Sequence, residues 1–564
     1  MNQTRTFLLF ALMAVAYLLW TAWEKDYGPQ PPAAPVATTT SVDGSVPGAM
    51  GTTPAAAIDN AQAGGQAATA QLITISSDVL RLTVDTRGGS VVRSELLDYP
   101  ETPRTKKNPD PAPVRLLDQA STDYFVAQSG LVSSHAEAPD HRAVFKAAQT
   151  NYELANGQNK LKVDLTWQDA AGLIVTKSYT LARGSYVVGL SQKIDNSGST
   201  AWQGNAYEQL QRVDRPEHTG WWQNMTDPSA ASFFGAAWYS PEDRFKTLKF
   251  TEFGKTPLQQ TITGGWAAML QHYFFVAWIP STKEANSYTT SVINPDTARP
   301  TYLIRTIGPA LDVAPGQSAT SSSQLYIGPK LIGTLDTVAP GLSLATNYGM
   351  FTVIATPIHK LLSWLHSISG NWGVAIILLV LIIKGLTWKL TATQYRSSAK
   401  MRKLQPRVNA LKERYGEDKQ KMQQAMMELY KKEKVNPMSG CLPVLITIPI
   451  FYGLYEVLRE SVELRQAPFF GWIHDLSAPD PFFVLPIIYT AVMLGQQWLM
   501  PATAGMDPTQ AKMMKFMPLI FAVMFAFFPA GLCLYYVVNG LTSLGQQLYL
   551  VHQVEKADSK PKVA

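Results

Sequence analysis

The chain has 564 residues, which is enough for about three to five domain-sized units. Hydrophobic residues make up 46% of it and charged residues only 16%, whereas charged residues are about 25% of an average soluble domain. This composition excludes a disordered chain, a coiled-coil rod and a collagen. The two cysteines, Cys441 and Cys533, lie in apolar runs and are interpreted as buried thiols, which excludes a disulfide scaffold and a cysteine-rich zinc protein.

Charge is distributed unevenly along the chain. From Glu24 to Met350 there are 25 Lys and Arg against 29 Asp and Glu, a net charge of −4, so with +6 overall the remainder carries +10. Because this basic excess lies beside apolar segments, it indicates contact with a membrane rather than with nucleic acid, and no DNA partner is expected.

Six segments approach the roughly 20 apolar residues that a membrane-spanning helix needs. The first runs from Phe7 to Trp23, and we expect an uncleaved anchor within residues 1–27, with a cleaved signal peptide as the alternative. Prolines interrupt several of the other five, so a packed helical bundle of six spans is predicted. These five candidates are Trp372–Thr391, Cys441–Glu460, Phe482–Met500, Lys512–Phe528 and Gly531–Val551.

Loop charge predicts the orientation of these spans. Between Arg396 and Lys434 there are twelve Lys and Arg against five Asp and Glu, whereas Arg465 is the only basic residue between Ser461 and Pro481. Basic loops remain on the cytoplasmic side of a membrane. Six spans then place both termini in the cytoplasm and residues 24 to about 350 outside, with a short cytoplasmic tail at 556–564.

The region before the C-terminal spans has the pattern of a β-domain. Residues 28–70 are rich in Pro, Ala, Gly and Thr and are expected to be a linker. From Gln71 onward, LITISSDVLRLTVDTRGGSVVRSELL alternates apolar and polar residues around an Arg87-Gly88-Gly89 turn, and similar short runs recur to about Tyr326. Residues 71–340 are therefore predicted to form a large external antiparallel β-sandwich.

Aromatic and histidine residues of this domain give weaker signals. Its tryptophans either form a groove that stacks on sugar or peptide, or fill a wide sandwich core; they are Trp202, Trp221, Trp222, Trp238, Trp266 and Trp278. The histidines have no metal-ligand spacing, so no metal site is expected; they are His135, His141, His218 and His272.

Residues 341–370 are predicted to include an amphipathic helix. Ile358, Leu361, Leu362 and Leu365 share one face, with His359 and other polar residues away from it. A helix lying on the outer membrane surface fits this pattern, and a soluble helix packed against the sandwich is the alternative.

The basic loop at 396–435 is predicted to be a helical hairpin. Apolar residues recur with spacings of three and four on both sides of Gly416, and Pro406 is expected to start the first helix. Its surface either docks on anionic phospholipids, or docks on ribosomal RNA and targeting proteins, or is only a solvated basic loop. The residues expected to dock are Arg396, Lys400, Arg402, Lys403 and Arg407.

Lys384 is the basic residue that lies well inside an apolar span, in NWGVAIILLVLIIKGLTWKL. It is about 18 Å along the helix from Trp372, a depth at which a charge is costly and indicates function. Extension of the side chain to the cytoplasmic interface is the alternative. An unpaired lysine suggests a water-filled cavity that opens to the cytoplasm.

Other residues complete this predicted cavity. Polar groups gather toward the cytoplasmic half of the spans, among them Gln496, Asn539, Tyr535 and Tyr536, while the third and fifth candidate spans are apolar and rich in Met and Phe. A polar cavity beside a soft apolar wall suits a guest helix that moves sideways into lipid.

Enzyme chemistry is not expected. A membrane Ser–Lys hydrolase is the enzymatic alternative, because Ser439 and Ser543 lie toward the cytoplasmic side with Lys384. No G-x-S-x-G, H-E-x-x-H or P-loop pattern is present, so neither an enzyme nor a cofactor is predicted.

Three segments resemble signatures of the YidC membrane-protein insertase family in its Gram-negative bacterial form. They are KVNPMSGCLPVLITIPIFYGLY, ELRQAPFFGWIHDLSAPDP and FPAGLCLYYVVNGLTSLGQQ, and VLRLTVDTRGGSVV of the external domain resembles the same family. The resemblance implies an insertase and folding chaperone of the bacterial inner membrane. It also implies a five-span core at 371–555 and a periplasmic supersandwich-like β-domain without a catalytic role.

The resemblance also implies roles for single residues. Lys384 matches the family's cavity arginine, a departure that keeps the charge but loses the planar donor fork. Tyr536 matches a substrate-contacting aromatic residue, and Phe451 and Met524 match the apolar slide. Tyr535, next to Tyr536, is expected to contact the substrate as well. The implied partners are nascent membrane proteins, the Sec translocon, and the ribosome and signal-recognition-particle receptor.

Two other classes of function remain as alternatives. A transporter would need inverted repeats and a coupled ion site, and neither is seen. A membrane-anchored periplasmic sugar sensor would use the external tryptophans but would not need five further spans.

Overall fold

The computed structural model describes residues 46–47, 70–120, 122–215, 229, 232–416, 418–433, 442–499 and 508–558, and every structural statement below concerns these residues. The chain divides into two compact units, Met1–Ala63 and Gly64–Ala564. The predicted N-terminal anchor lies outside the described residues, as do most of the linker and the tryptophans Trp221 and Trp222. The fold below is therefore that of the second unit.

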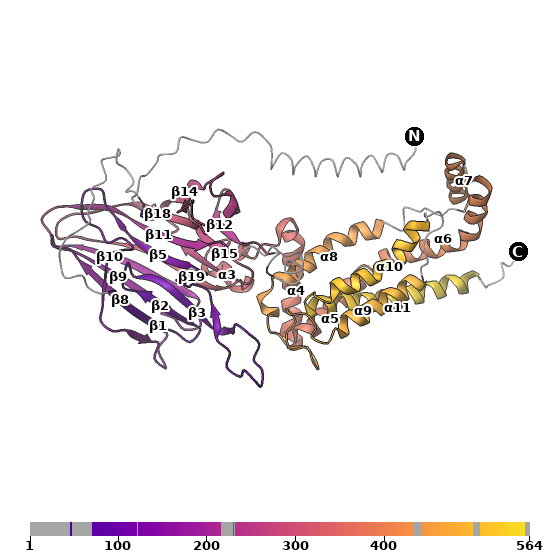
Figure 1. The fold of residues 1–564 in the computed structure, drawn as a ribbon, viewed down its shortest axis with the longest axis horizontal. Coiled ribbons are helices and arrows are strands. Elements are labelled where there is room, and N and C mark those ends of the chain that lie inside the picture. Colours follow the sequence, from indigo (N-terminus) through magenta and orange to yellow (C-terminus); the bar gives the residue numbers. More distant parts are fainter. Residues whose placement is uncertain are drawn as a thin grey trace. The chain divides into compact units, whose positions relative to one another are not determined.

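Two large β-sheets form the first part of this unit (Figure 1). The first sheet has the order β14 (Gln259–Thr263), β17 (Ala285–Ile293), β18 (Thr301–Val313), β11 (Trp202–Val213), β5 (Phe125–Val132), β3 (Ser90–Pro100), β2 (Leu80–Asp85), β1 (Leu72–Ser76) and β7 (Asn151–Glu153), with β4 (Pro113–Arg115) beside β3. The second has the order β13 (Arg244–Lys249), β12 (Gly235–Ser240), β15 (Trp266–Leu270), β16 (Phe274–Ile279), β19 (Ser318–Pro329), β10 (Val187–Asn196), β9 (Leu173–Ala182), β8 (Lys160–Gln168) and β6 (Lys146–Ala147). The described strand pairs are antiparallel except for the parallel pair of β1 with β7.

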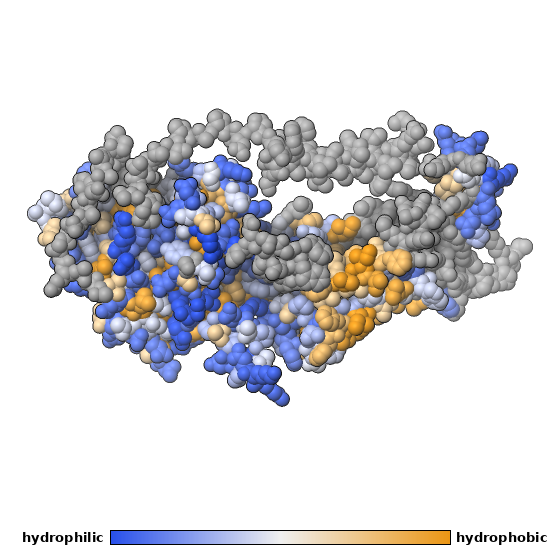
Figure 2. Space-filling model, in the orientation of Figure 1, coloured by the Kyte–Doolittle hydropathy of each residue, from blue (hydrophilic) through white to orange (hydrophobic). Residues whose placement is uncertain are grey.

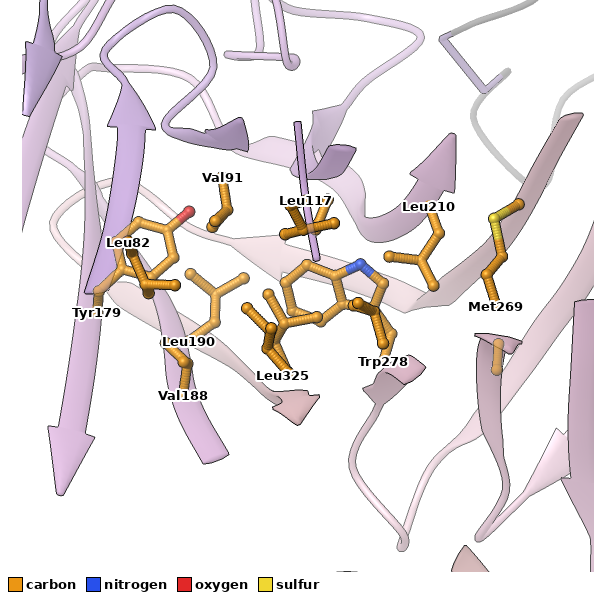
Figure 3. Packing of buried hydrophobic residues seen from close by; sticks show 14 of the residues in the cluster. Leu82, Val91, Leu117, Tyr179, Val188, Leu190, Leu210, Met269, Trp278 and Leu325 are labelled. Atoms are coloured by element: carbon orange, nitrogen blue, oxygen red, sulfur yellow. The ribbon is translucent and has the colours of Figure 1, made fainter. Parts of the chain in front are cut away.

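One hydrophobic core lies between the two sheets. Figure 3 shows Trp278 of β16 among aliphatic side chains, with Leu210 coming from the first sheet and Leu325 from the second. The indole N–H of Trp278 donates to the carbonyl of Gln209 at 3.0 Å, so this buried aromatic ring has its one polar group satisfied. The large antiparallel β-domain predicted from the sequence is therefore present.

The alternating pattern and the glycine turn explain the first strands. β1, β2 and β3 pair in order, and Gly88 and Gly89 in the connection between β2 and β3 have φ angles of +71° and +60°. A Cβ atom on Gly88 would lie 2.2 Å from the carbonyl oxygen of His141, so both backbone conformation and space require glycine there.

Some strands are buried on both faces. β12, β15 and β16 have every residue buried, because one face meets the sandwich core and the other meets a second cluster. That cluster includes residues of α3 (Ile332–Val338) and of the short helix η2 (Leu342–Ala345). Trp266 lies in it, and its indole N–H donates to the carbonyl of Pro340 at 3.2 Å. The four described tryptophans of the set are buried, which favours the core interpretation over an open stacking groove.

The rest of the unit is helical (Figure 1). After η3 (Gly349–Phe351) come α4 (Thr352–Ser369), α5 (Trp372–Leu386), α6 (Trp388–Tyr415), α7 (Lys419–Lys432), α8 (Leu442–Glu460), η5 (Val462–Leu464), α9 (Val484–Leu499), α10 (Pro508–Phe525) and α11 (Ala530–Asp558). Helices thus occur in all five C-terminal segments where spans were predicted.

The described residues do not form a clear bundle of six membrane-spanning helices. Among the described residues, no helix by itself has the length and apolarity to cross a membrane, while Trp372–Leu386 and Trp388–Gln394, bent by 65° at Thr387, meet both conditions as a pair. The number of spans stays a prediction.

α4 buries most of its predicted apolar face. Ile358, Leu362 and Leu365 are buried in the cluster that α4 shares with α5 and α8, and Leu361 is half-buried. His359, expected away from that face, is also buried, with its Nε2 atom 3.6 Å from a carboxylate oxygen of Glu463.

The hairpin consists of α6 and α7, whose polar surface is visible in Figure 2. Leu404 and Val408, two of the regularly spaced apolar residues before Gly416, are buried. The expectation that Pro406 starts the first helix was wrong, because Pro406 lies inside α6. The break in the path from α5 is at Thr387, where the helix axis bends instead.

Candidate functional site

Lys384 lies in the last turn of α5 and points toward α11. Its ammonium group donates to the hydroxyl oxygen of Ser543 at 2.6 Å. The Ser543 hydroxyl donates in turn to the carbonyl of Asn539, one turn earlier in α11, at 2.7 Å. The recorded partner of Lys384 is thus a neutral hydroxyl rather than a carboxylate, and the positive charge is not neutralised by this contact.

Further polar groups lie along the same stretch of α11. Gln496 of α9 donates from its side-chain nitrogen to the carbonyl of Gly540 at 2.8 Å. Gln546 and Gln547 follow Ser543 by three and four residues, hence on the same side of the helix, and both are buried. Among the described residues, Gln546 Oε1 and Gln547 Nε2 have no hydrogen-bond partner. The residues around Lys384 therefore retain unused donor and acceptor capacity.

The Lys384–Ser543 pair has the spacing of a Ser–Lys dyad but lacks the rest of a hydrolase site. Ser543 lies inside the helix α11, where backbone N–H groups are engaged in the helical hydrogen-bond pattern. An oxyanion hole needs free N–H donors beside the nucleophile. The geometry therefore does not favour hydrolysis. In addition, the described residues contain no group of three or more His, Cys, Asp or Glu able to hold a metal.

An aromatic cluster forms the apolar part of the site. The ring centroid of Tyr536 lies 5.3 Å from that of Phe451, 5.3 Å from that of Tyr489 and 4.6 Å from that of Phe525. Tyr535 is 5.4 Å from Tyr536 on the same helix. Helices α8, α9, α10 and α11 each contribute at least one of these rings.

Met524 of α10 packs against the same cluster, half-buried. The structure thus brings together Phe451, Met524, Tyr535 and Tyr536, which the sequence proposed as the apolar contacts. Sequence reasoning missed Tyr489 and Phe525. An aromatic residue in an apolar run looks the same in the sequence whether it belongs to a substrate-binding surface or to an ordinary hydrophobic core.

Apolar side chains also cover the outside of the helices, as the orange atoms of Figure 2 show. The large apolar residues exposed on α9 and α10 are Ile487, Ile488, Leu494, Trp498, Phe516, Met517, Leu519, Ile520 and Val523. Contiguous exposed apolar surface of this kind is typical of contact with lipid or with another apolar partner.

The five hairpin residues lie along α6, on the strongly basic stretch of the chain. Arg407 of α6 forms an ion pair with Glu433, the residue directly after α7. This ion pair links the two helices of the hairpin. The side chains of Arg396, Lys400, Arg402 and Lys403 fall outside the described residues.

The helical part thus combines a half-buried lysine among polar groups, an aromatic cluster formed by four helices, and exposed apolar surface, and the chain also carries a large β-sandwich domain.

Comparison with known proteins identifies the family. Residues 72–361 match the family model described as the YidC periplasmic domain, and residues 364–557 match that of the 60Kd inner membrane protein. A protein of Thioalkalivibrio sulfidiphilus named membrane protein insertase YidC is 43% identical, with 99% of this chain and 100% of the relative covered. Proteins of the same name from Xanthomonas campestris and Aeromonas hydrophila are 44% and 45% identical, with 99% of both chains covered in each case.

A crystal structure of an active YidC insertase is also similar, with 18% identity, a TM-score of 0.36, and coverage of 85% of this chain and 92% of that chain. From the sequence matches, this chain belongs to the YidC family of bacterial inner-membrane proteins. The resemblance inferred from the sequence is confirmed, and the relatives are named as insertases rather than as enzymes.

Proposed function

We propose that this protein inserts newly made membrane proteins, its clients, into the bacterial inner membrane and assists their folding, both alone and with the Sec translocon. The observation that carries the proposal is the contact of 2.6 Å between the Lys384 ammonium and the Ser543 hydroxyl, in a helix pair bordered by unsatisfied polar groups. Membership of the YidC family supports the same function.

The polar side of the site receives the client segment that must cross the membrane. Lys384 attracts the acidic or polar external segment of a short client into a cavity that opens to the cytoplasm. Asn539 and Gln496 help to solvate that segment there. Each polar group that enters such a site loses less hydration than it would lose in lipid, so the barrier to crossing falls.

The apolar side of the site receives the helix of the client. This helix passes along Phe451, Met524, Tyr535 and Tyr536 and leaves sideways into lipid. Burial of its apolar surface provides about 25 cal/mol per Å², which drives the step without a nucleotide. The half-burial of Phe451 and Met524 leaves part of this wall accessible in the absence of a client.

The basic hairpin recruits the client from the cytoplasm. In this arrangement both termini of the protein and the α6–α7 hairpin are cytoplasmic, and the β-domain is periplasmic. Arg396, Lys400, Arg402, Lys403 and Arg407 dock on anionic phospholipids, the ribosome or the signal-recognition-particle receptor.

Insertion into liposomes tests the proposal. Purified full-length protein is reconstituted, a short radiolabelled single-span client with an acidic external segment is added, and protease protection reports the inserted fraction. We expect insertion by the parent protein and by Lys384→Arg, and loss of insertion by Lys384→Ala and Lys384→Glu. Full activity of Lys384→Glu with this client would contradict the role given to the charge.

A further inference from the structure

The outer end of α8 carries a buried carboxylate that pairs with the β-domain. Glu460, the last residue of α8, and Lys330, directly after β19, are 3% and 2% exposed, respectively, with 3.5 Å between carboxylate and ammonium. The hydroxyl of Ser232 donates to the other carboxylate oxygen at 2.8 Å, and the Arg459 guanidinium lies 3.3 Å from that same oxygen. Both ends of this ion pair are therefore withdrawn from water.

Adjacent contacts extend this junction. The ring Nε2 of His272, in the connection before β16, lies 3.0 Å from the carbonyl of Arg459 and donates to it. Burial lowers the pKa of His272 to about 4, so the ring is neutral at ordinary pH and suits this role. Beyond the helix, Arg465 and Gln466 donate to the carbonyls of Glu101 and Pro100 at 3.0 and 2.9 Å. The segment from Arg459 to Gln466 is thus attached to the β-domain at several points.

The energetics of this pair differ from those of a surface ion pair. Two charges buried together compensate one another. Neutralisation of Glu460 leaves the buried Lys330 ammonium without its counter-charge, and neutralisation of Lys330 leaves the buried carboxylate with Arg459 as its remaining ion-pair partner, so either change is destabilising. Burial lowers the pKa of Lys330 while Glu460 opposes that shift, which is the balance expected of a mutually dependent pair. A change at either residue is therefore expected to push the two surfaces apart.

α8 connects this junction to the aromatic cluster, because it carries both Glu460 and Phe451. Phe451 precedes Glu460 by nine residues, or about 14 Å of helix. Pro449 cannot donate a helical hydrogen bond, so α8 is locally weakened two residues before Phe451. Leu454, Val457 and Leu458, which lie between Phe451 and Glu460, are buried against neighbouring helices.

We infer that the Lys330–Glu460 pair is a positioning contact: it fixes the outer end of α8 and thereby holds the Phe451 ring in place against Tyr535 and Tyr536. The inference rests on the proposed function in that Phe451 is taken as a client contact. The β-domain then has a role in insertion that requires no ligand and no client contact of its own.

The distance between α8 and α11 tests the inference without a client. Spin labels are attached at Ile448→Cys and Leu541→Cys, two exposed positions, in full-length protein whose native cysteines are replaced by alanine and whose insertion activity is verified first. We expect a narrow distance distribution in this parent and a broader or shifted one in Lys330→Met and in Glu460→Gln. Lys330→Arg, which keeps the charge, should preserve the parental distribution.

Insertion is measured on the same set of proteins. We expect each single variant to lower the initial rate about tenfold, within the coupling range of contacting residues. The Lys330→Met/Glu460→Gln double variant should be no worse than either single variant, because the two residues act through each other. Additive effects, an unchanged distance in the single variants, or an altered distance with normal insertion would each overturn the inference.

Two control variants separate positioning from loss of stability. Lys162→Met removes an exposed lysine of the same domain, 3.0 Å from Asp164. Lys177→Met removes a fully buried lysine whose ammonium contacts lie within the sandwich. Both should leave the label distance unchanged, and a broadening in Lys177→Met equal to that in Lys330→Met would overturn the inference. Failure of the parent to insert any client would instead contradict the proposed function, and the distances would still decide the junction.

Discussion

At the scale of single residues, the Ser543 hydroxyl accepts a hydrogen bond from the Lys384 ammonium and thereby orients the lysine side chain toward α11. Replacement of Ser543 by alanine removes that acceptor, and a hydrogen bond to a charged group contributes about 1.5–3 kcal/mol. Because Lys384 is only half-buried and water can replace part of the contact, we expect about a tenfold loss of insertion for acidic clients. Ser543→Thr should retain activity. Liposome insertion of matched acidic and uncharged clients measures the effect, and equal losses for both would argue against a link to charge.

Lys177 predicts an unusual pH dependence of β-domain stability. Its ammonium donates to the carbonyls of Gly88 and Ser129 at 2.6 and 2.9 Å, yet complete burial lowers its pKa to about 7. The unfolded chain, with a lysine pKa near 10.4, binds more protons than the folded domain between about pH 7 and 10.4, so stability rises with pH across that window. Below pH 7 this contribution is constant.

Lys177→Met should abolish this rise. Unfolding of the β-domain, followed by tryptophan fluorescence in denaturant from pH 7 to 10, measures the difference between the two proteins. A parallel pH dependence in parent and variant would refute the assignment to Lys177.

Sequence reasoning found Lys384 but not its partner, and the reason is physical. A charge inside an apolar run is costly, so the residue stands out by itself. Ser543 is 159 positions away and a hydroxyl in a helix is common, so nothing in the sequence links the two. The same holds for Lys330 and Glu460, because each resembles an ordinary surface charge until the fold buries both.

At the scale of elements, a loop packs closely against the first turn of α5. A Cβ atom on Gly373 would lie 2.0 Å from the ring of Phe469, which belongs to the connection between α8 and α9. Gly373→Val should therefore displace that connection and destabilise the helical part by about 1–3 kcal/mol, the usual cost of overpacking.

Gly385 provides the matched control in the same helix. Nothing lies within 4 Å of a Cβ atom there, so Gly385→Ala should be neutral or should stabilise the helix by up to about 1 kcal/mol. Thermal unfolding of the two variants in detergent compares them, and equal melting temperatures would show that the predicted steric conflict is absent.

Strands could be predicted from the sequence where one face of the strand is exposed to water. They could not be recognised where both faces are buried. β8 alternates between exposed and buried residues, so its period of two is visible in the sequence. β15 and β16 are buried throughout, since the sandwich core covers one face and α3 with η2 covers the other. Such continuous apolar runs cannot be distinguished by periodicity from buried helices.

At the scale of the whole molecule, the charge pattern predicts on which side of the membrane each part of the chain lies. Single cysteines at Lys421 in the hairpin and at Lys162 in the β-domain should react with a membrane-impermeant maleimide from opposite sides. We expect Lys162→Cys to react in cells whose outer membrane has been permeabilised, and Lys421→Cys only after the inner membrane is opened. Labelling of both from one side would contradict the six-span arrangement.

The large β-domain was predictable because the pattern of the chain changes along its length, from alternating strands to continuous apolar runs. The span count stays a prediction, because the N-terminal segment lies outside the described residues and no described helix by itself is both long and apolar enough to cross a membrane. Family membership, by contrast, depended on long motifs in the helical part and did not require the fold.

The strand order of the sandwich has a consequence for the time at which the domain can form. β18 joins β17 to β11 in one sheet, and β19 joins β16 to β10 in the other, so the last two strands of the domain close both sheets in the middle. The first sheet exists only as two separate pieces with open edges until the chain has been synthesised as far as Val313, and the second sheet does so until Pro329. Such long-range pairing is slow. The domain must therefore emerge, and be kept from aggregating, as an incomplete chain, and its cooperative folding begins only when translation has already reached the helices.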